Sequence, residues 1–153
     1  MLLCFQTALG QERKLLQAVK SESGIKVDGL LKETFWQSAP EAGGFVQQEP
    51  FNGRPSSFDT KVYVGYDDDA LYIGAVILDP VKDSISFELH ERDNIGLADY
   101  FGVMLDPFND GLTGFGFVVT TRGVQGDLKL NNWDDEDYSW DAVWKSAVVV
   151  SDS

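Results

Sequence analysis

Two apolar runs of eight residues, joined by a tight acidic turn, constrain the fold of this chain more than any other feature. The runs are Asp59–Tyr66 and Leu71–Leu78, with Asp67, Asp68 and Asp69 between them. Period-2 alternation of β-branched and aromatic residues on either side of a short turn predicts a β-hairpin. The second run is apolar on both faces, which predicts a strand buried in the middle of a sandwich.

Other short apolar runs follow the same pattern. Further strands are predicted at Leu15–Val19, Ile25–Val27, Ile85–Leu89, Asp99–Asp106, Gly114–Thr121, Val124–Leu130 and Ala142–Val150. One short helix is expected at Leu30–Gln37, where Leu31 and Phe35 share a face and Pro40 follows. Many short strands, frequent turns and one helix predict an all-β fold, namely an antiparallel two-sheet β-sandwich of jelly-roll or immunoglobulin-like form.

The net charge narrows the range of partners. The 153 residues include 25 Asp and Glu against 12 Lys and Arg, which gives a net charge of −13. A surface this acidic repels nucleic acid and anionic membrane surfaces. We therefore expect no nucleic-acid partner. It suits divalent cations and neutral polar ligands such as sugars. Solubility alone is the competing explanation of the charge.

The amino-terminal segment differs in character from the rest of the chain. Leu2–Leu9 is similar to the end of a signal-peptide hydrophobic region, with a cut before Gln11. A buried first strand is the alternative. We expect residues 1–10 to be a signal-peptide remnant that carries away Cys4, and residues 11–153 to form a single sandwich domain. The expected location is therefore exported: periplasmic, outer-membrane-associated or extracellular.

Several segments together resemble carbohydrate-binding module family 9. The matching segments are Ile25–Gly29, Glu33, Trp36, Tyr66–Gly74, Asp79 with Pro80, and Asp99–Asp106. Others are similar to a subgroup in which this module leads exported bacterial proteins whose remainder is like an outer-membrane barrel. These are Arg92 with Asp93, Asp106–Phe117, Gly123–Asp127 and Ser139–Trp144.

The resemblance implies a β-sandwich that binds polysaccharide chain ends, holds calcium in some members and performs no catalysis, usually beside a glycoside hydrolase. This chain departs from the family at the sugar clamp. Where the first clamping tryptophan belongs, it has residues 95–97, and the second belongs beyond residue 153. Val118 stands near the place of a site arginine, and Lys32 stands where the family has an acid. The resemblance therefore supports the fold better than the sugar site.

The loop at residues 131–141, rich in aromatic and acidic side chains, is the predicted sugar site. Sugar rings stack on aromatic faces, and carboxylates or amides bind their hydroxyls. The predicted ligand-binding residues are Trp133, Trp140, Tyr138, Asn131, Asp99 and Gln125. The alternative is that the tryptophans cap the sandwich edge, since Trp140 and Trp144 share a face by alternation.

Calcium and haem are the cofactors to consider. Calcium takes about six to eight oxygen ligands from loops, and Asp106, Asn109 and Asp110 are its predicted ligands. Turn formation is the alternative for these residues. Haem ligation through Met104 and His90 is a further alternative, although Met104 more simply fills an apolar face.

We therefore expect a non-catalytic carbohydrate-binding domain, accessory to polysaccharide or oligosaccharide binding or degradation by an exported bacterial protein. The alternative is a structural or interaction domain that precedes a C-terminal outer-membrane β-barrel and binds no sugar itself. The apolar run Val143–Val150, with no later strand to pair with, favours this alternative and indicates a fragment of a longer protein.

Overall fold

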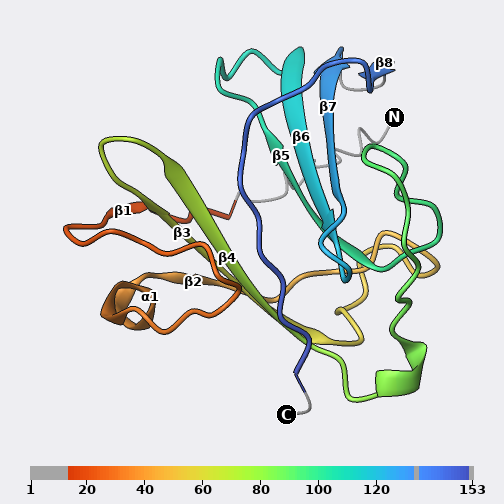
Figure 1. Cartoon of the computed structure of the whole chain (residues 1–153), viewed down its shortest axis with the longest axis horizontal. Coiled ribbons are helices and arrows are strands. Elements are labelled where there is room, and N and C mark those ends of the chain that lie inside the picture. The colour runs from red at the N-terminus through yellow and green to blue at the C-terminus, as the bar shows by residue number, and fades with distance from the viewer. Residues whose placement is uncertain (1–13, 133–134, 152–153) are drawn as a thin grey trace, which may run out of the picture.

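The computed structural model describes residues 14–132 and 135–151, which form a sandwich of two four-stranded sheets (Figure 1). The first sheet holds β1 (Val19–Lys20), β2 (Glu41–Ala42), β3 (Asp59–Tyr66) and β4 (Leu71–Leu78). The second holds β5 (Tyr100–Leu105), β6 (Thr113–Thr120), β7 (Gln125–Asn131) and β8 (Asp135–Asp137). A short helix, α1 (Thr34–Ser38), and a 3-10 turn at Lys82–Ser84 complete the elements of the described chain. The predicted all-β sandwich with one short helix is confirmed.

The predicted first hairpin is also confirmed, because β3 and β4 pair antiparallel along their full length. Asp67 builds its turn, since Asp67 Oδ1 accepts the backbone N–H groups of Asp69 at 2.9 Å and Ala70 at 2.8 Å. The expectation that β4 is buried in the middle of the sandwich is wrong. Among the described strands β4 pairs with β3 alone, and its terminal side chains, Leu71 and Leu78, are exposed.

Helix α1 packs on the face of the first sheet that is turned away from the second sheet (Figure 1). Gly65 on β3 and Gly74 on β4 leave room for the helix, and a Cβ on Gly65 would lie 2.2 Å from the Phe35 ring. Phe35 and Trp36 are buried there and meet edge to face, with 5.0 Å between ring centroids. With Ala39 they form a buried hydrophobic cluster, against which Tyr63 and Tyr72 of the first sheet pack.

The second sheet runs in the order β5-β6-β7-β8, and its register sorts the side chains onto two faces. The tryptophan face looks toward the first sheet. On it the Trp140 ring packs at a tilt against Phe115, and the Trp144 ring packs edge to face against Phe117. The tyrosine face is the opposite face of the same sheet, turned away from the first sheet. It carries Tyr100, Gly102, Met104, Gly116, Val118 and Leu128. The predicted strand at 99–106 and the second predicted hairpin are therefore confirmed.

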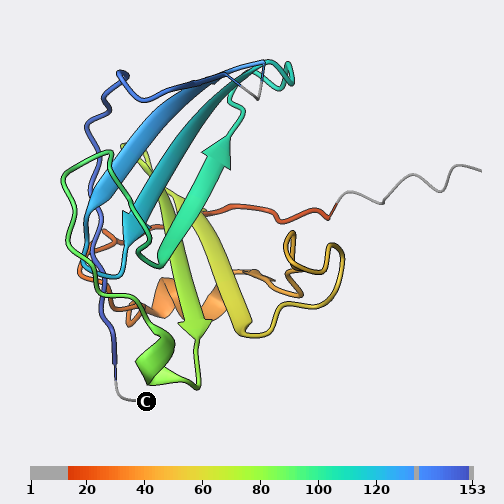
Figure 2. The ribbon, with the colours of Figure 1, turned by 90° about the vertical axis from the view of Figure 1, so that its right-hand side faces the viewer.

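Residues 140–150, called the strap below, run along one edge of the sandwich from the second sheet toward α1 (Figures 1 and 2). Near its end Val149 meets Gly29, where an added Cβ would lie 2.9 Å from the valine. The predicted strand at Ala142–Val150 is wrong, since these described residues form no strand. Side chains of β7 and of the loop before β5 bond to the strap backbone instead of a neighbouring strand.

The predicted strand at Ile85–Leu89 is wrong for a similar reason. The Ser86 N–H donates to Asp99 Oδ2 at 2.8 Å, and Thr121 Oγ1 donates to the Ser86 carbonyl at 2.6 Å. Arg122 Nε donates to the next carbonyl in that run at 3.2 Å. Side chains from neighbouring segments thus take the backbone groups that a strand would have paired.

The helix and several short strands also differ from prediction. Of the described runs at 15–19 and 25–27, only Val19 enters a strand, β1, which pairs parallel with β3. The helix begins at Thr34 rather than Leu30, because Asp28 Oδ1 holds the Leu30 N–H in a turn at 2.9 Å. Strand β8 lies inside the predicted loop and pairs with β7.

The predicted signal-peptide remnant and Cys4 lie outside the described residues. In the part of the chain that the structure describes, no helix has the length and apolar character needed to cross a bilayer.

Candidate functional site

Two exposed tyrosines lie on the tyrosine face, and one of them is the predicted ligand Tyr138. Tyr138, which follows β8, is 44% exposed, and Tyr100 at the start of β5 is 61% exposed. The Tyr138 hydroxyl donates to Glu136 Oε2 at 2.7 Å. This hydrogen bond, with partial burial, the Glu136 charge and the nearby Tyr100, raises the pKa of Tyr138 to about 12. Tyr100 is therefore close enough to Tyr138 to affect its ionisation.

Glycines form the floor between these tyrosines. Met104 Sδ lies over Gly116, 2.7 Å from the position of an added Cβ, and Tyr100 Cε2 lies 3.8 Å from that position on Gly102. Leu128 is buried beneath them. Tyr100, Met104 and Tyr138 are therefore exposed over central sheet residues that are themselves buried, such as Val118 and Leu128. We call this surface the tyrosine platform and define it by Tyr100, Met104, Glu136 and Tyr138.

The platform carries little charge. Among the outward positions of the described strands β5 to β8, Glu136 is the one ionisable acid, and none is a lysine or arginine. Its carboxylate accepts hydrogen bonds, and the tyrosine faces offer flat apolar contact. This set of groups suits a ligand that presents both C–H faces and hydroxyl donors.

The second predicted aromatic ligand, Trp140, lies on the other side of the sheet. Its ring is 4.8 Å from Phe115 and 6.1 Å from Phe117, measured between centroids, and the side chain is half-buried. Trp144 packs edge to face against Phe117 in the same layer, with 5.4 Å between centroids. Trp140 thus packs on the phenylalanines of β6, and the structure does not bring it together with Tyr138.

Two further predicted ligands also lie apart from the platform, and a third is not among the described residues. Asn131 is half-buried at the end of β7, where it pairs with Thr113 and Asp135. Asp99 uses its carboxylate to hold the loop before β5, as described above. Trp133 lies outside the described residues.

The last predicted ligand, Gln125, joins a polar network that ties the strap to β7. Gln125 Nε2 donates to Ser146 Oγ at 3.0 Å and to the Trp144 carbonyl at 3.5 Å. Its Oε1 accepts a hydrogen bond from Arg92 Nη1 at 2.9 Å, and Arg92 also donates to the Ala142 carbonyl at 3.2 Å. Both ends of the Gln125 amide are therefore engaged in structure.

Asp127 is the centre of this network, although sequence patterns did not single it out. The residue is fully buried, and its carboxylate accepts hydrogen bonds from Arg92, from the Ala142 N–H and from Trp144 Nε1, the last at 3.2 Å. A buried carboxylate requires such partners to offset the loss of solvation. The available signal in the sequence was an acidic residue, Asp127, in the middle of the predicted strand Val124–Leu130. We call Arg92, Gln125, Asp127 and Trp144 the strap latch.

The predicted calcium ligands form a turn. Asp106 Oδ2 accepts the Gly111 N–H at 3.0 Å, and Asp110 Oδ1 accepts the N–H groups of Thr113 at 2.9 Å and Leu112 at 2.8 Å. The bonds from Thr113 and Leu112 lower the pKa of Asp110. Within the described residues no group of three or more His, Cys, Asp or Glu is arranged to hold a metal ion. Calcium stays a prediction without a ready-made ligand set.

The two residues considered for haem have partners of their own. Met104 lies over Gly116, and the His90 ring packs against Gly96 with His90 Nε2 3.0 Å from Glu88 Oε2. Met104 thus belongs to the platform and His90 to the loop before β5.

A polar hollow of about 250 Å³ lies beside the β3–β4 turn. Its lining includes Lys20, Glu22 and Asp67–Asp69, and Lys20 Nζ is 2.6 Å from Asp68 Oδ1. No aromatic ring lines it, so it lacks the flat apolar surface that sugar stacking needs.

Comparisons of the chain with protein-family models, with curated proteins and with solved structures found no match. Its function is therefore inferred from the chemistry of these groups.

Proposed function

We propose that this protein is a non-catalytic carbohydrate-binding domain that uses the tyrosine platform. The observation that carries the proposal is the outward pair Tyr100 and Tyr138, with the Tyr138 hydroxyl held by Glu136. Exposed apolar side chains that lie together on one face are a common feature of ligand-binding surfaces. The segments that resemble carbohydrate-binding module family 9 support the same function.

The chemistry of the platform fits a sugar. A pyranose ring has an apolar C–H face that stacks on a phenol ring, and its hydroxyls donate to a carboxylate such as Glu136. The hydrogen bond from Tyr138 to Glu136 fixes the ring before a ligand arrives. A fixed side chain loses less conformational entropy on binding, which strengthens a weak interaction.

A binding role fits the platform better than hydrolysis does. Glycoside cleavage needs two facing carboxyl groups, roughly 5–10 Å apart. The outward positions of the described strands β5 to β8 supply Glu136 alone. The proposal therefore assigns polysaccharide attachment to this domain, in an exported bacterial protein in which another part acts on the polymer.

One observation favours the alternative, a structural or interaction domain next to an outer-membrane barrel. Val143, Val148, Val149 and Val150 of the strap are exposed. Exposed apolar residues in one segment indicate a contact with another part of a protein. In this alternative the strap binds that part, and the platform binds no sugar.

Calorimetry with soluble polysaccharides tests the proposal. We expect dissociation constants in the micromolar to millimolar range and a loss of at least about tenfold, or about 1.4 kcal/mol, in Tyr100→Ala. Tyr66→Ala is the matched control, since Tyr66 is a 41% exposed tyrosine at the end of β3, and it should bind as the parent protein does. Absence of binding to every glycan at millimolar concentration would contradict the proposal.

A further inference from the structure

We propose that the tyrosine platform binds the interior of an extended, uncharged polysaccharide chain, rather than a chain end. This inference rests on the proposed function and specifies its ligand. It departs from the chain-end binding that the family resemblance implies. Three observations carry it: the width of the platform, its openness and its charge.

The platform is wider than one sugar ring. Tyr100 lies on β5, and Tyr138 follows β8 on the far side of the same sheet. Three strand spacings of about 4.8 Å separate β5 from β8, which makes roughly 14 Å. A chain that crosses the strands can place different rings on Tyr100 and Tyr138.

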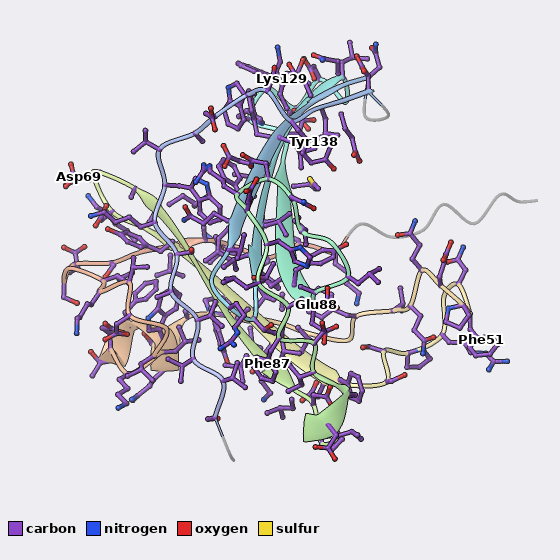
Figure 3. All side chains as sticks on the ribbon, turned by 45° about the vertical axis from the view of Figure 1, so that its right-hand side comes forward. Phe51, Asp69, Phe87, Glu88, Lys129 and Tyr138 are labelled. Carbon is purple, nitrogen blue, oxygen red and sulfur yellow. The ribbon has the colours of Figure 1, made fainter. Side chains whose placement is uncertain are left out.

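The platform is also open. Gly102 and Gly116 form its floor, and both tyrosines and Met104 are exposed along it. The loop before β5 covers one flank, where Ile95 Cδ1 lies 3.3 Å from the position of a Cβ on Gly126. Figure 3 shows Phe87 and Glu88 of that loop well away from Tyr138. A chain-end site encloses its sugar in a pocket, whereas an open surface lets the chain continue past both tyrosines.

The charge of the platform selects an uncharged chain. Its ionisable acid, Glu136, accepts hydroxyl donors, and the outward sheet positions of the described strands provide no cation to pair with a uronate or sulfate. The net charge of −13 adds a long-range repulsion of polyanions. The absence of cations at these positions and the repulsion of polyanions together favour neutral hexose or pentose polymers.

Binding of oligosaccharides of graded length tests the inference. The probes are cello-, xylo- and manno-oligosaccharides of one to six rings, each with a free reducing end or with that end reduced to an alditol. We expect affinity for at least one series to rise at least tenfold from one ring to six, with less than a twofold effect of end reduction. Polygalacturonate should not bind.

Two variants connect this behaviour to the platform. Tyr100→Ala should abolish the gain of affinity with length. Tyr138→Phe, which keeps the ring but removes the bond to Glu136 that fixes it, should weaken binding at every length and keep the gain with length. Tyr66→Ala serves again as the control for an exposed tyrosine elsewhere, and circular dichroism confirms that each variant is folded.

The outcomes separate the two proposals. Affinity that depends on the free end, that is already maximal for one ring or that is higher for polygalacturonate overturns the interior-chain inference and leaves carbohydrate binding intact. Length dependence that survives in Tyr100→Ala removes the platform from the explanation. Binding of none of the probes or polysaccharides overturns both proposals together.

Discussion

Gly65 allows α1 to pack closely on the first sheet because its side chain is only a hydrogen atom. A Cβ at this position would lie 2.2 Å from the Phe35 ring, so even a methyl group forces the helix to shift. We predict that Gly65→Ala lowers the free energy of unfolding by about 1–3 kcal/mol. Urea denaturation followed by tryptophan fluorescence measures this, since Trp36 lies in the same contact.

Gly24→Ala is the control for that experiment. Nothing lies within 4 Å of a Cβ at Gly24, so the substitution should change stability by less than about 0.5 kcal/mol. Equal effects of the two substitutions would show that α1 does not pack on Gly65 as described.

Tyr138 provides a prediction in alkaline solution. Its pKa is raised to about 12, first by the hydrogen bond to Glu136, whereas an unfolded tyrosine ionises near pH 10. A group whose pKa is raised on folding stabilises the fold below the unfolded value and loses that contribution as the pH rises toward the folded value. The pKa values of Tyr63 and Tyr72 are also raised, by hydrogen bonds to Glu41 and Asp67. Ultraviolet titration should therefore show Tyr138 ionising near pH 12, and Tyr138→Phe should reduce the absorbance change there by one phenolate. An undiminished change in the variant would assign that transition to another tyrosine.

At the scale of elements, the strap depends on side chains for its position. We predict that Asp127→Ala costs roughly 3 kcal/mol, because it leaves Trp144 Nε1 and the Ala142 N–H without their buried acceptor. Relative to the parent protein, Asp127→Ala should speed the hydrogen exchange of amides in residues 140–150 more than that of amides in β6.

Asp141→Asn is the matched control for the latch. Asp141 is also an acid beside Arg92, at 3.6 Å, but its side chain is 76% exposed. An exposed pair contributes less than about 1 kcal/mol, and the exchange of the strap should stay unchanged. If Asp127→Ala exchanged no faster than Asp141→Asn, the latch would not hold the strap.

The strap also marks the limit of prediction from sequence at this scale. Alternation is a local property, so it located the β3–β4 and β6–β7 hairpins. The same alternation in Ala142–Val150 predicted a strand, but pairing needs a neighbouring strand, and the strap bonds to the distant residues Arg92 and Gln125. Local sequence patterns cannot reveal partners that lie so far apart along the chain.

The candidate site was predictable in part for the same reason. Tyr138 was predicted from its aromatic and acidic surroundings, while Tyr100 was seen only as one position of a strand. Their common face follows from the register of four strands, which the sequence does not state. Trp140 has similar neighbours in the chain to those of Tyr138, yet it faces Phe115.

At the scale of the whole molecule, charge repulsion opposes folding. A net charge of −13 favours the expanded chain, and salt screens this repulsion. The screening length falls from about 30 Å at 0.01 M to about 8 Å at 0.15 M ionic strength. We predict that the melting temperature rises by roughly 3 °C over this range, as expected for a gain of about 1 kcal/mol. A fall would mean that ion pairs such as Lys20–Asp68 outweigh the repulsion.

The path of the strap has a mechanical consequence. It is fixed to β7 by the latch, and its other end meets Gly29 just before α1. A pulling force applied at Val150 is therefore carried first by the contact at Gly29 and then by the bonds around Asp127, before the hairpin ladders bear any load. Extension of the molecule would peel this edge open in sequence, with the two sheets still intact.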